Sequence, residues 1–157
     1  MPKHSAGLLL YRRKDREIEV FLVHPGGPLW ANKDLGAWSV PKGEHSADED
    51  PLDAARREFK EETGFPVDGE FVELGTVRQA GGKLLSAWAL EGDCDPAKLS
   101  SNHCRMQWPP RSDRMIDFPE VDRGAWFTLG EARDHILLSQ RPLLDRLQKE
   151  LGSAHQP

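Results

Sequence analysis

The sequence has little cysteine and no long hydrophobic run. Its 157 residues include only two cysteines, Cys94 and Cys104, too few for the disulfide framework of a small secreted domain. We therefore expect both to be free thiols in a reducing, cytoplasmic environment. The apolar run near the N-terminus covers only residues 7–10, which is too short for a signal peptide or a membrane span. No association with a membrane is expected.

An excess of basic residues is also absent. The formal net charge is −5 at pH 7, which argues against a nonspecific nucleic-acid-binding protein. An anionic small molecule remains a compatible substrate, because a bound cation reverses the local field. The six histidines are scattered, and no C-x-x-C pair accompanies them, so the pattern does not indicate a zinc site.

The length and composition are those of one compact domain. A chain of 157 residues with 38% hydrophobic and 30% charged residues can bury a core without disulfides. No internal repeat or low-complexity linker divides it. We expect a single domain over residues 1–151, followed by a flexible tail at 152–157.

Patterns of strand and helix alternate along the chain. Apolar and β-branched runs predict strands at 5–11, 18–23, 37–40, 71–77, 84–90 and 125–128. A polar turn is expected at 12–16, a glycine-rich loop at 26–36 and a long irregular segment at 91–118. Helices are expected at 51–63, 129–136 and 141–151. This order predicts an α/β or α+β fold with a mixed sheet.

The helix predicted at 51–63 has clear end signals. Asp50 is a suitable N-cap, Pro51 fits the first helical position, and Gly64 supplies a C-terminal stop. On this helix Glu58 and Glu62 are spaced i, i+4, so they share one face.

Glu61 flanks the same face of this helix. Three neighbouring carboxylates repel one another, and a hard divalent cation such as Mg²⁺ would remove that cost. Arg57 lies four residues before Glu61 and could orient it through a forked pair of hydrogen bonds. A solvated acidic helix face is the alternative reading of these few residues taken alone.

The wider spacing favours the metal site. The order is G-x5-E-x7-R-E-U-x-E-E-x-G-U, where U is apolar, formed by Gly43, Glu49, Arg57, Glu58, Phe59, Glu61, Glu62, Gly64 and Phe65. A chance match is on the order of 10⁻⁷ per chain of this length. The segment from Gly43 to Phe65 resembles the box of the Nudix hydrolase family, and residues 38–44 (WSVPKGE) resemble its usual lead-in.

The resemblance implies a mixed β-sheet sandwiched between α-helices and an enzyme that cleaves phosphoanhydride bonds with Mg²⁺, or alternatively Mn²⁺. It implies metal ligands at Glu58, Glu61, Glu62 and the carbonyl of Gly43, with Arg57 and Glu49 as orienting residues. An acidic residue outside the box often joins such a set. Glu120 is our choice, with Glu91 and Asp122 as competitors. The general base stays open among Glu61, Glu62 and Glu120.

The substrate is less constrained than the chemistry. Lys42 and Lys83 are candidate phosphate contacts, and Trp30, in a predicted loop, is a candidate base-stacking residue. The chain loosely resembles the diadenosine tetraphosphate hydrolase branch, but the segment 100–114 departs from it. That segment could be a lid, a specificity loop or a dimer contact, so a homodimer is one expectation.

Three other functions stay open. The first is a nucleotide-sensing module that binds without turnover. The second is a hydrolase acting on the 5′ end of RNA, for which Arg105, Arg111 and Arg114 could form a local basic patch. The third is removal of damaged nucleoside triphosphates. Of the partners considered, a small nucleotide fits best, and nucleic acid fits poorly with the acidic balance.

Overall fold

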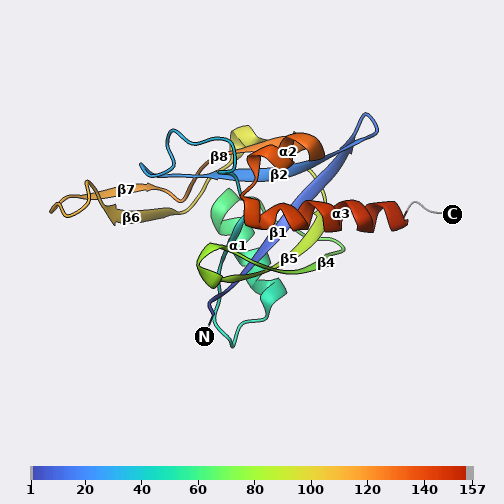
Figure 1. Ribbon diagram of the computed structural model, residues 1–157, viewed down its shortest axis with the longest axis horizontal. Coiled ribbons are helices and arrows are strands. Elements are labelled where there is room, and N and C mark those ends of the chain that lie inside the picture. Colours follow the sequence, from blue (N-terminus) through green and yellow to red (C-terminus); the bar gives the residue numbers. More distant parts are fainter. Residues whose placement is uncertain (1, 155–157) are drawn as a thin grey trace.

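A six-stranded mixed sheet forms the centre of the protein, as a computed structural model describes it for residues 2–154 (Figure 1). The strand order is β4-β5-β1-β2-β8, and β3 pairs with β1. Strand β1 runs parallel to β5 and antiparallel to β2 and β3. The strands are β1 (His4–Lys14), β2 (Glu17–Pro25), β3 (Lys42–Glu44), β4 (Val72–Arg78), β5 (Leu84–Glu91) and β8 (Val121–Thr128).

Helices cover both faces of this sheet. One face packs on α1 (Pro51–Thr63), which contributes Ala54, Ala55 and Phe59 to the core. The other face packs on α2 (Leu129–His135) and α3 (Arg141–Ala154). Alternate residues of β1 divide between the two cores, with Leu8 and Leu10 toward α1 and Leu9 toward α3, as the period of a strand requires. The predicted mixed sheet sandwiched between helices is confirmed.

Helix α1 has the predicted bounds. The Asp50 side chain accepts a hydrogen bond from the backbone N–H of Asp53, Pro51 is the first helical residue, and Gly64 has a positive φ of 81°. Each end is therefore fixed by local chemistry. Burial of Phe59 and its neighbours then orients the helix, so that its carboxylates lie beside β3 rather than in open solvent.

Two predicted boundaries near β1 and β3 are wrong. The expected turn at 12–16 is only two residues long, because Asp15 and Arg16 both take positive φ, 51° and 71°, as a tight hairpin turn needs. The expected strand at 37–40 is not a ladder. Trp38 and Ser39 make isolated bridges to different partners, and the strand that does form, β3, begins after Pro41.

The segment 91–118 is not irregular throughout, contrary to expectation. It contains β6 (His103–Gln107), and β7 (Met115–Pro119) begins within it and ends just beyond it; the two strands pair antiparallel as a two-stranded ribbon. Figure 1 shows this ribbon projecting from the body at the end opposite the C-terminus. Short 3₁₀ turns occur at Ala80–Gly82, Pro96–Lys98 and Leu138–Gln140.

The C-terminal helix is longer than predicted. Helix α3 continues to Ala154, three residues into the stretch that we expected to be a tail. The rest of that stretch, residues 155–157, lies outside the described residues. The domain boundary at 151 stays a prediction. Cys94 and Cys104 are both free thiols, as expected.

Candidate active site

Two carboxylates of α1 are buried although they are ionisable. Glu58 is 7% exposed and Glu62 6% exposed. Burial, reinforced by the charge of Glu120, raises the pKa of Glu62 to about 8. Burial, with the charge of Glu61 second, also raises the pKa of Glu58. Carboxylates kept at such a cost are a mark of a functional site rather than of an ordinary helix surface.

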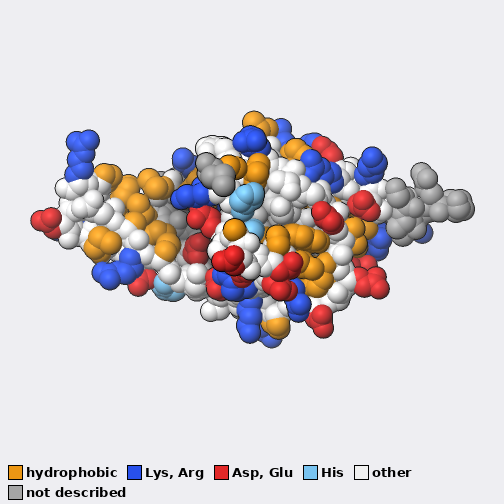
Figure 2. All heavy atoms as spheres, turned by 90° about the horizontal axis from the view of Figure 1, so that it is seen from below, with side chains coloured by type: hydrophobic (Ala, Val, Ile, Leu, Met, Phe, Trp, Pro, Cys, Tyr) orange, Lys and Arg blue, Asp and Glu red, His pale blue; other side chains and the backbone are white. Residues whose placement is uncertain are grey.

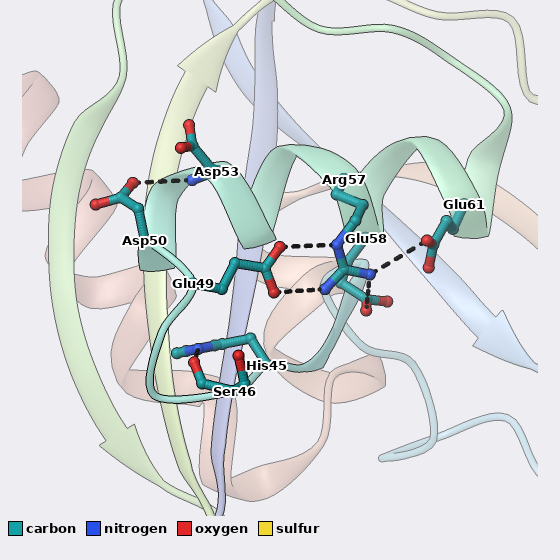
Figure 3. Close-up of polar contacts among 8 residues, drawn as sticks. All are labelled: His45, Ser46, Glu49, Asp50, Asp53, Arg57, Glu58 and Glu61. Atoms are coloured by element: carbon teal, nitrogen blue, oxygen red, sulfur yellow. Dashed lines mark hydrogen bonds and ion pairs between the residues drawn. The ribbon is translucent and has the colours of Figure 1, made fainter.

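Arg57 joins the carboxylates of the box (Figure 3). Its Nε and Nη2 donate to the two oxygens of Glu49, each at 2.9 Å. Its Nη1 donates to Glu58 at 2.8 Å and to Glu61 at 3.2 Å. These hydrogen bonds raise the pKa of the Arg57 guanidinium and lower the pKa of Glu49. The predicted orienting pair, Arg57 and Glu49, is therefore in contact with two of the predicted ligands.

Strand β3 lies against the buried carboxylates. The backbone N–H of Lys42 donates to Glu62 Oε1 at 3.1 Å. A Cβ at Gly43 would lie 2.0 Å from the carboxyl carbon of Glu58. Only glycine lets the β3 backbone approach this carboxylate so closely, and that approach brings the Gly43 backbone among the acidic side chains.

A pocket of about 460 Å³ collects most of the predicted site. Its lining includes seven predicted residues, Lys42, Gly43, Glu58, Glu61, Glu62, Lys83 and Glu120, together with Ser5, Glu44 and Asn102, which the sequence did not single out. A second pocket of about 150 Å³ shares Lys42, Glu62 and Glu120 with it and adds the apolar side chains of Val23 and Val121. The site is thus a polar cavity with a smaller, more apolar neighbour.

Glu120 reaches the pocket from the turn between β7 and β8. Its N–H donates to the carbonyl of Asn102 at 2.8 Å, and its carbonyl accepts from Gly26 at 2.9 Å. Neither competitor lines the pocket. Asp122 contacts His24 at 2.9 Å, and Glu91 lies 3.9 Å from Arg13. Among the three acids considered, Glu120 alone lies with the box carboxylates.

Two of the lining residues, Lys42 and Lys83, bring positive charge to the pocket. Lys83 Nζ lies 3.1 Å from Glu44 Oε1, and Lys3 lies 3.9 Å from the same oxygen. These lysines, with Lys83 first, lower the pKa of Glu44. Lys42 begins β3 and also lines the cavity. Anionic groups entering the cavity would therefore meet two lysines in its lining.

Trp30 is not among the residues that line these two pockets. It is half-buried, packs against the core on the α3 side of the sheet, and has Lys33 Nζ 5.1 Å from its ring centroid. Its predicted stacking role gains no support from this placement. Asn102 was missed because it is a single polar residue without a local pattern, and Glu44, although it stands in the lead-in at 38–44, was assigned no role. Their place at the site comes from β3 and from the start of the β6–β7 ribbon.

The donor set suits a hard divalent cation in its chemistry. The four predicted ligand carboxylates, together with the carbonyl of Gly43 from the same lining, offer oxygen ligands only, which Mg²⁺ and Mn²⁺ prefer. Within residues 2–154, however, no three acidic, histidine or cysteine side chains form a metal-binding cluster. Arg57 draws Glu58 and Glu61 to itself, while Glu62 accepts from Lys42. Metal binding would therefore require side-chain rotations within the pocket.

Comparison with known proteins identifies the family. The NUDIX domain model matches residues 1–147, and the chain belongs to this family. The fold resembles an Ap4A hydrolase of C. elegans in a binary complex, with a TM-score of 0.67 and 24% identity over 95% of this chain and 98% of that one. It also resembles the NUDIX domain of Shewanella oneidensis NrtR complexed with ADP ribose, with a TM-score of 0.68 and 18% identity over 96% and 89%.

A third similar structure is the Nudix hydrolase RenU of M. smegmatis, with a TM-score of 0.57 and 20% identity over 96% of this chain and 87% of that one. No curated protein sequence matches the chain. The predicted class is confirmed: the protein is an enzyme of the Nudix pyrophosphohydrolase type. None of the helices formed by residues 2–154 is long and apolar enough to cross a membrane.

Proposed function

We propose that the protein is a Mg²⁺-dependent hydrolase that cleaves a phosphoanhydride bond in a nucleoside-diphosphate-linked substrate by attack of water at phosphorus. The observation that carries this proposal is the single pocket lined by Glu58, Glu61, Glu62 and Glu120, with Lys42 and Lys83 beside them. Carboxylates alone would repel a diphosphate. Carboxylates that hold a cation, next to lysines, would instead bind it.

Glu58, Glu62 and Glu120 are the side chains that would hold the metal, with Glu61 and the Gly43 carbonyl as further donors. When bound, Mg²⁺ supplies positive charge to phosphate oxygens and acidifies nearby water. The chain's own residues orient the reactants. Arg57 and Glu49 hold the acidic helix face in place, and Lys42 and Lys83 contact phosphate. One of Glu61, Glu62 and Glu120 accepts the proton of the attacking water.

A diadenosine polyphosphate is our first choice of substrate, and a nucleoside triphosphate is the second. The likeness to the C. elegans Ap4A hydrolase over nearly the whole of both chains supports this order. The NrtR domain in complex with ADP ribose makes that compound a necessary member of any substrate panel.

Product analysis tests the proposal. The pure protein is incubated with Mg²⁺ and diadenosine tetraphosphate, nucleoside triphosphates, NADH or ADP-ribose, and separately with a 5′-triphosphorylated RNA. We expect ATP plus AMP from the dinucleotide, with loss of turnover in EDTA. Glu62→Gln should lose roughly 10³-fold or more in rate, because a buried charge next to the metal is removed. Glu73→Gln, an exposed glutamate on β4, is the matched control.

Each outcome has a distinct meaning. Turnover of another panel member would keep the hydrolase and replace the substrate. A folded Glu62→Gln variant with most of its activity would overturn the metal site. Binding without turnover of any compound would support the nucleotide-sensing module instead. The cytoplasmic location and the homodimer expected from the sequence stay predictions.

A further inference from the structure

His24 is a buried histidine that the proposed chemistry does not use. It lies in β2, its side chain is fully buried, and both of its ring nitrogens have partners. Nδ1 lies 2.9 Å from Asp122 Oδ1, and Nε2 lies 2.6 Å from the backbone carbonyl oxygen of Lys33. The ring also meets the Trp38 ring edge-on, with their centroids 5.2 Å apart. The imidazole is therefore held in one orientation.

The partners determine where the hydrogens lie. A backbone carbonyl only accepts hydrogen bonds, so Nε2 of His24 carries a hydrogen and donates it to Lys33. The other nitrogen, Nδ1, lies 2.9 Å from Oδ1 of the Asp122 carboxylate, at hydrogen-bond distance. His24 thus forms two hydrogen bonds, one from each ring nitrogen, to Asp122 and to the Lys33 carbonyl.

These two bonds join segments that are far apart in sequence. Lys33 belongs to the loop at 26–36, and Asp122 lies two residues after Glu120. Other contacts follow the same path. The N–H of Gly26 donates to the Glu120 carbonyl at 2.9 Å, and a Cβ at Gly26 would lie only 2.0 Å from the Pro119 carbonyl oxygen. The β2–β8 pairing also shifts register between His24 and Pro25, at the point where Glu120 turns toward the pocket.

We propose that His24 and Asp122 form a clip that positions Glu120 in the active site. The clip fixes the start of β8 to the loop at 26–36, so the Glu120 backbone has one conformation when its side chain binds the metal. His24 is then a positioning residue that acts through Asp122, since it lines neither of the two site pockets. This inference rests on the proposed metal-binding role of Glu120.

The same clip holds the loop that carries Trp30. The N–H of Lys33 donates to the Trp30 carbonyl at 3.0 Å, and the Lys33 carbonyl is the one bound by His24. A break between His24 and Asp122 would therefore loosen both segments. Outer hydrogen bonds of this kind typically change metal affinity 10- to 100-fold when they are removed from metalloenzymes.

Two substitutions at Asp122 separate the hydrogen bond from the charge. Asp122→Asn and Asp122→Ala remove the same negative charge, but only asparagine can donate a hydrogen bond to Nδ1 of a neutral His24. Asp122 is at the surface, so both variants should fold, which circular dichroism checks. Mn²⁺ binding to the free protein is measured by calorimetry, and amide hydrogen exchange is measured at Gly26 and Glu120. The Glu120→Gln variant serves as the reference.

We expect Asp122→Ala to bind Mn²⁺ about 10-fold more weakly and to exchange both amides faster, while Asp122→Asn stays close to wild type in both measurements. Equal effects of the two variants would overturn the clip, because only the shared loss of charge would then matter. So would an Asp122→Ala protein with unchanged exchange. If Glu120→Gln binds Mn²⁺ like wild type, the ligand role in the proposed function is wrong. The exchange data would then still decide whether the clip itself exists.

Discussion

The guanidinium of Arg57 donates two parallel hydrogen bonds, each of 2.9 Å, to the carboxylate of Glu49. Glu49 lies in the loop before α1, and Arg57 lies in the second turn of that helix. The fork therefore ties the loop that follows β3 to the helix that carries the ligands. The third guanidinium nitrogen, Nη1, donates to Glu58 and Glu61.

Arg57→Lys should impair catalysis more than stability. Lysine keeps the charge but cannot contact Glu49, Glu58 and Glu61 from one planar group. We expect kcat with the substrate that product analysis identifies to fall about 10-fold or more, as for lost outer hydrogen bonds at metal sites. The exposed pairs themselves contribute little to folding. Arg56→Lys is the control, since Arg56 reaches the Val67 carbonyl at 3.4 Å and lies over the Phe71 ring at 5.4 Å but forms no ion pair with a carboxylate of residues 2–154. Similar losses in both variants would contradict this role.

Gly43→Ala should act on the metal site through Glu58. The new methyl group would occupy the space of the Glu58 carboxylate, which would have to move away from β3. We expect Mn²⁺ affinity to fall about 10-fold or more. Gly130→Ala is the control, because nothing lies within 4 Å of a Cβ at that position. Titration calorimetry compares the two variants. Unchanged Mn²⁺ binding in Gly43→Ala would show that the close approach of Gly43 to Glu58 is not needed for the metal site.

The pH dependence of stability reports on Glu62. Burial, with the charge of Glu120, raises its pKa from 4.5 to about 8 in the folded protein. Between these values the folded state holds a proton that the unfolded chain has released. The free energy of unfolding of the metal-free protein therefore falls as pH rises through this window and levels off above about pH 8. One unit of pKa corresponds to about 1.4 kcal/mol.

In Glu62→Gln the side chain is a neutral amide that does not ionise, so the variant lacks this pH dependence. We expect it to match wild type near pH 5 in EDTA and to become more stable than wild type by about pH 8, by an amount on the order of a few kcal/mol. Urea unfolding followed by circular dichroism at several pH values measures the difference, with Glu73→Gln expected to parallel wild type throughout. If the Glu62→Gln and wild-type curves run parallel, Glu62 is not a strongly perturbed acid.

Local signals explain which parts of this fold were predictable. Helix α1 was predicted to the residue because Asp50, Pro51 and Gly64 each have a chemical reason to stand at a helix end. The ribbon β6–β7 was missed because its pairs, such as Cys104 with Phe118, are separated by many residues and by a turn containing two prolines. Pairing between distant residues leaves little trace in a short sequence window.

The site shows the same division. The box carboxylates follow from spacing on one helix, and the pocket contains them. Glu120 was chosen from its sequence context, and the turn between β7 and β8 brings it to the helix. Asn102 reaches the pocket only through tertiary packing, so no sequence pattern pointed to it, whereas Glu44 stands in the lead-in at 38–44 but was assigned no role. Trp30 was chosen for being in a loop, but that loop folds back on the core.

The β6–β7 ribbon is where we expect the homodimer to form. Alternate side chains of the two strands lie on one face of the ribbon, namely Cys104, Met106, Ile116 and Phe118. Neither core cluster includes them. Figure 2 shows hydrophobic side chains gathered on this projecting end. An isolated two-stranded ribbon is at best marginally stable in water. The whole chain has a net charge of −5, so two copies repel each other on average. The ribbon has three arginines and two aspartates, so it does not share this negative excess.

Substitutions on the two faces of the ribbon test this expectation. Ile116→Glu places a charge on the apolar face, whereas Met115→Glu places the same charge on the opposite face, where Met115 is already 53% exposed. Sedimentation velocity over a dilution series should find a dimer for wild type and Met115→Glu and a monomer for Ile116→Glu, because burial of an unpaired carboxylate costs several kcal/mol. A wild-type protein that stays monomeric at high concentration would rule out the homodimer. A dimer that survives Ile116→Glu would place its interface elsewhere on the protein.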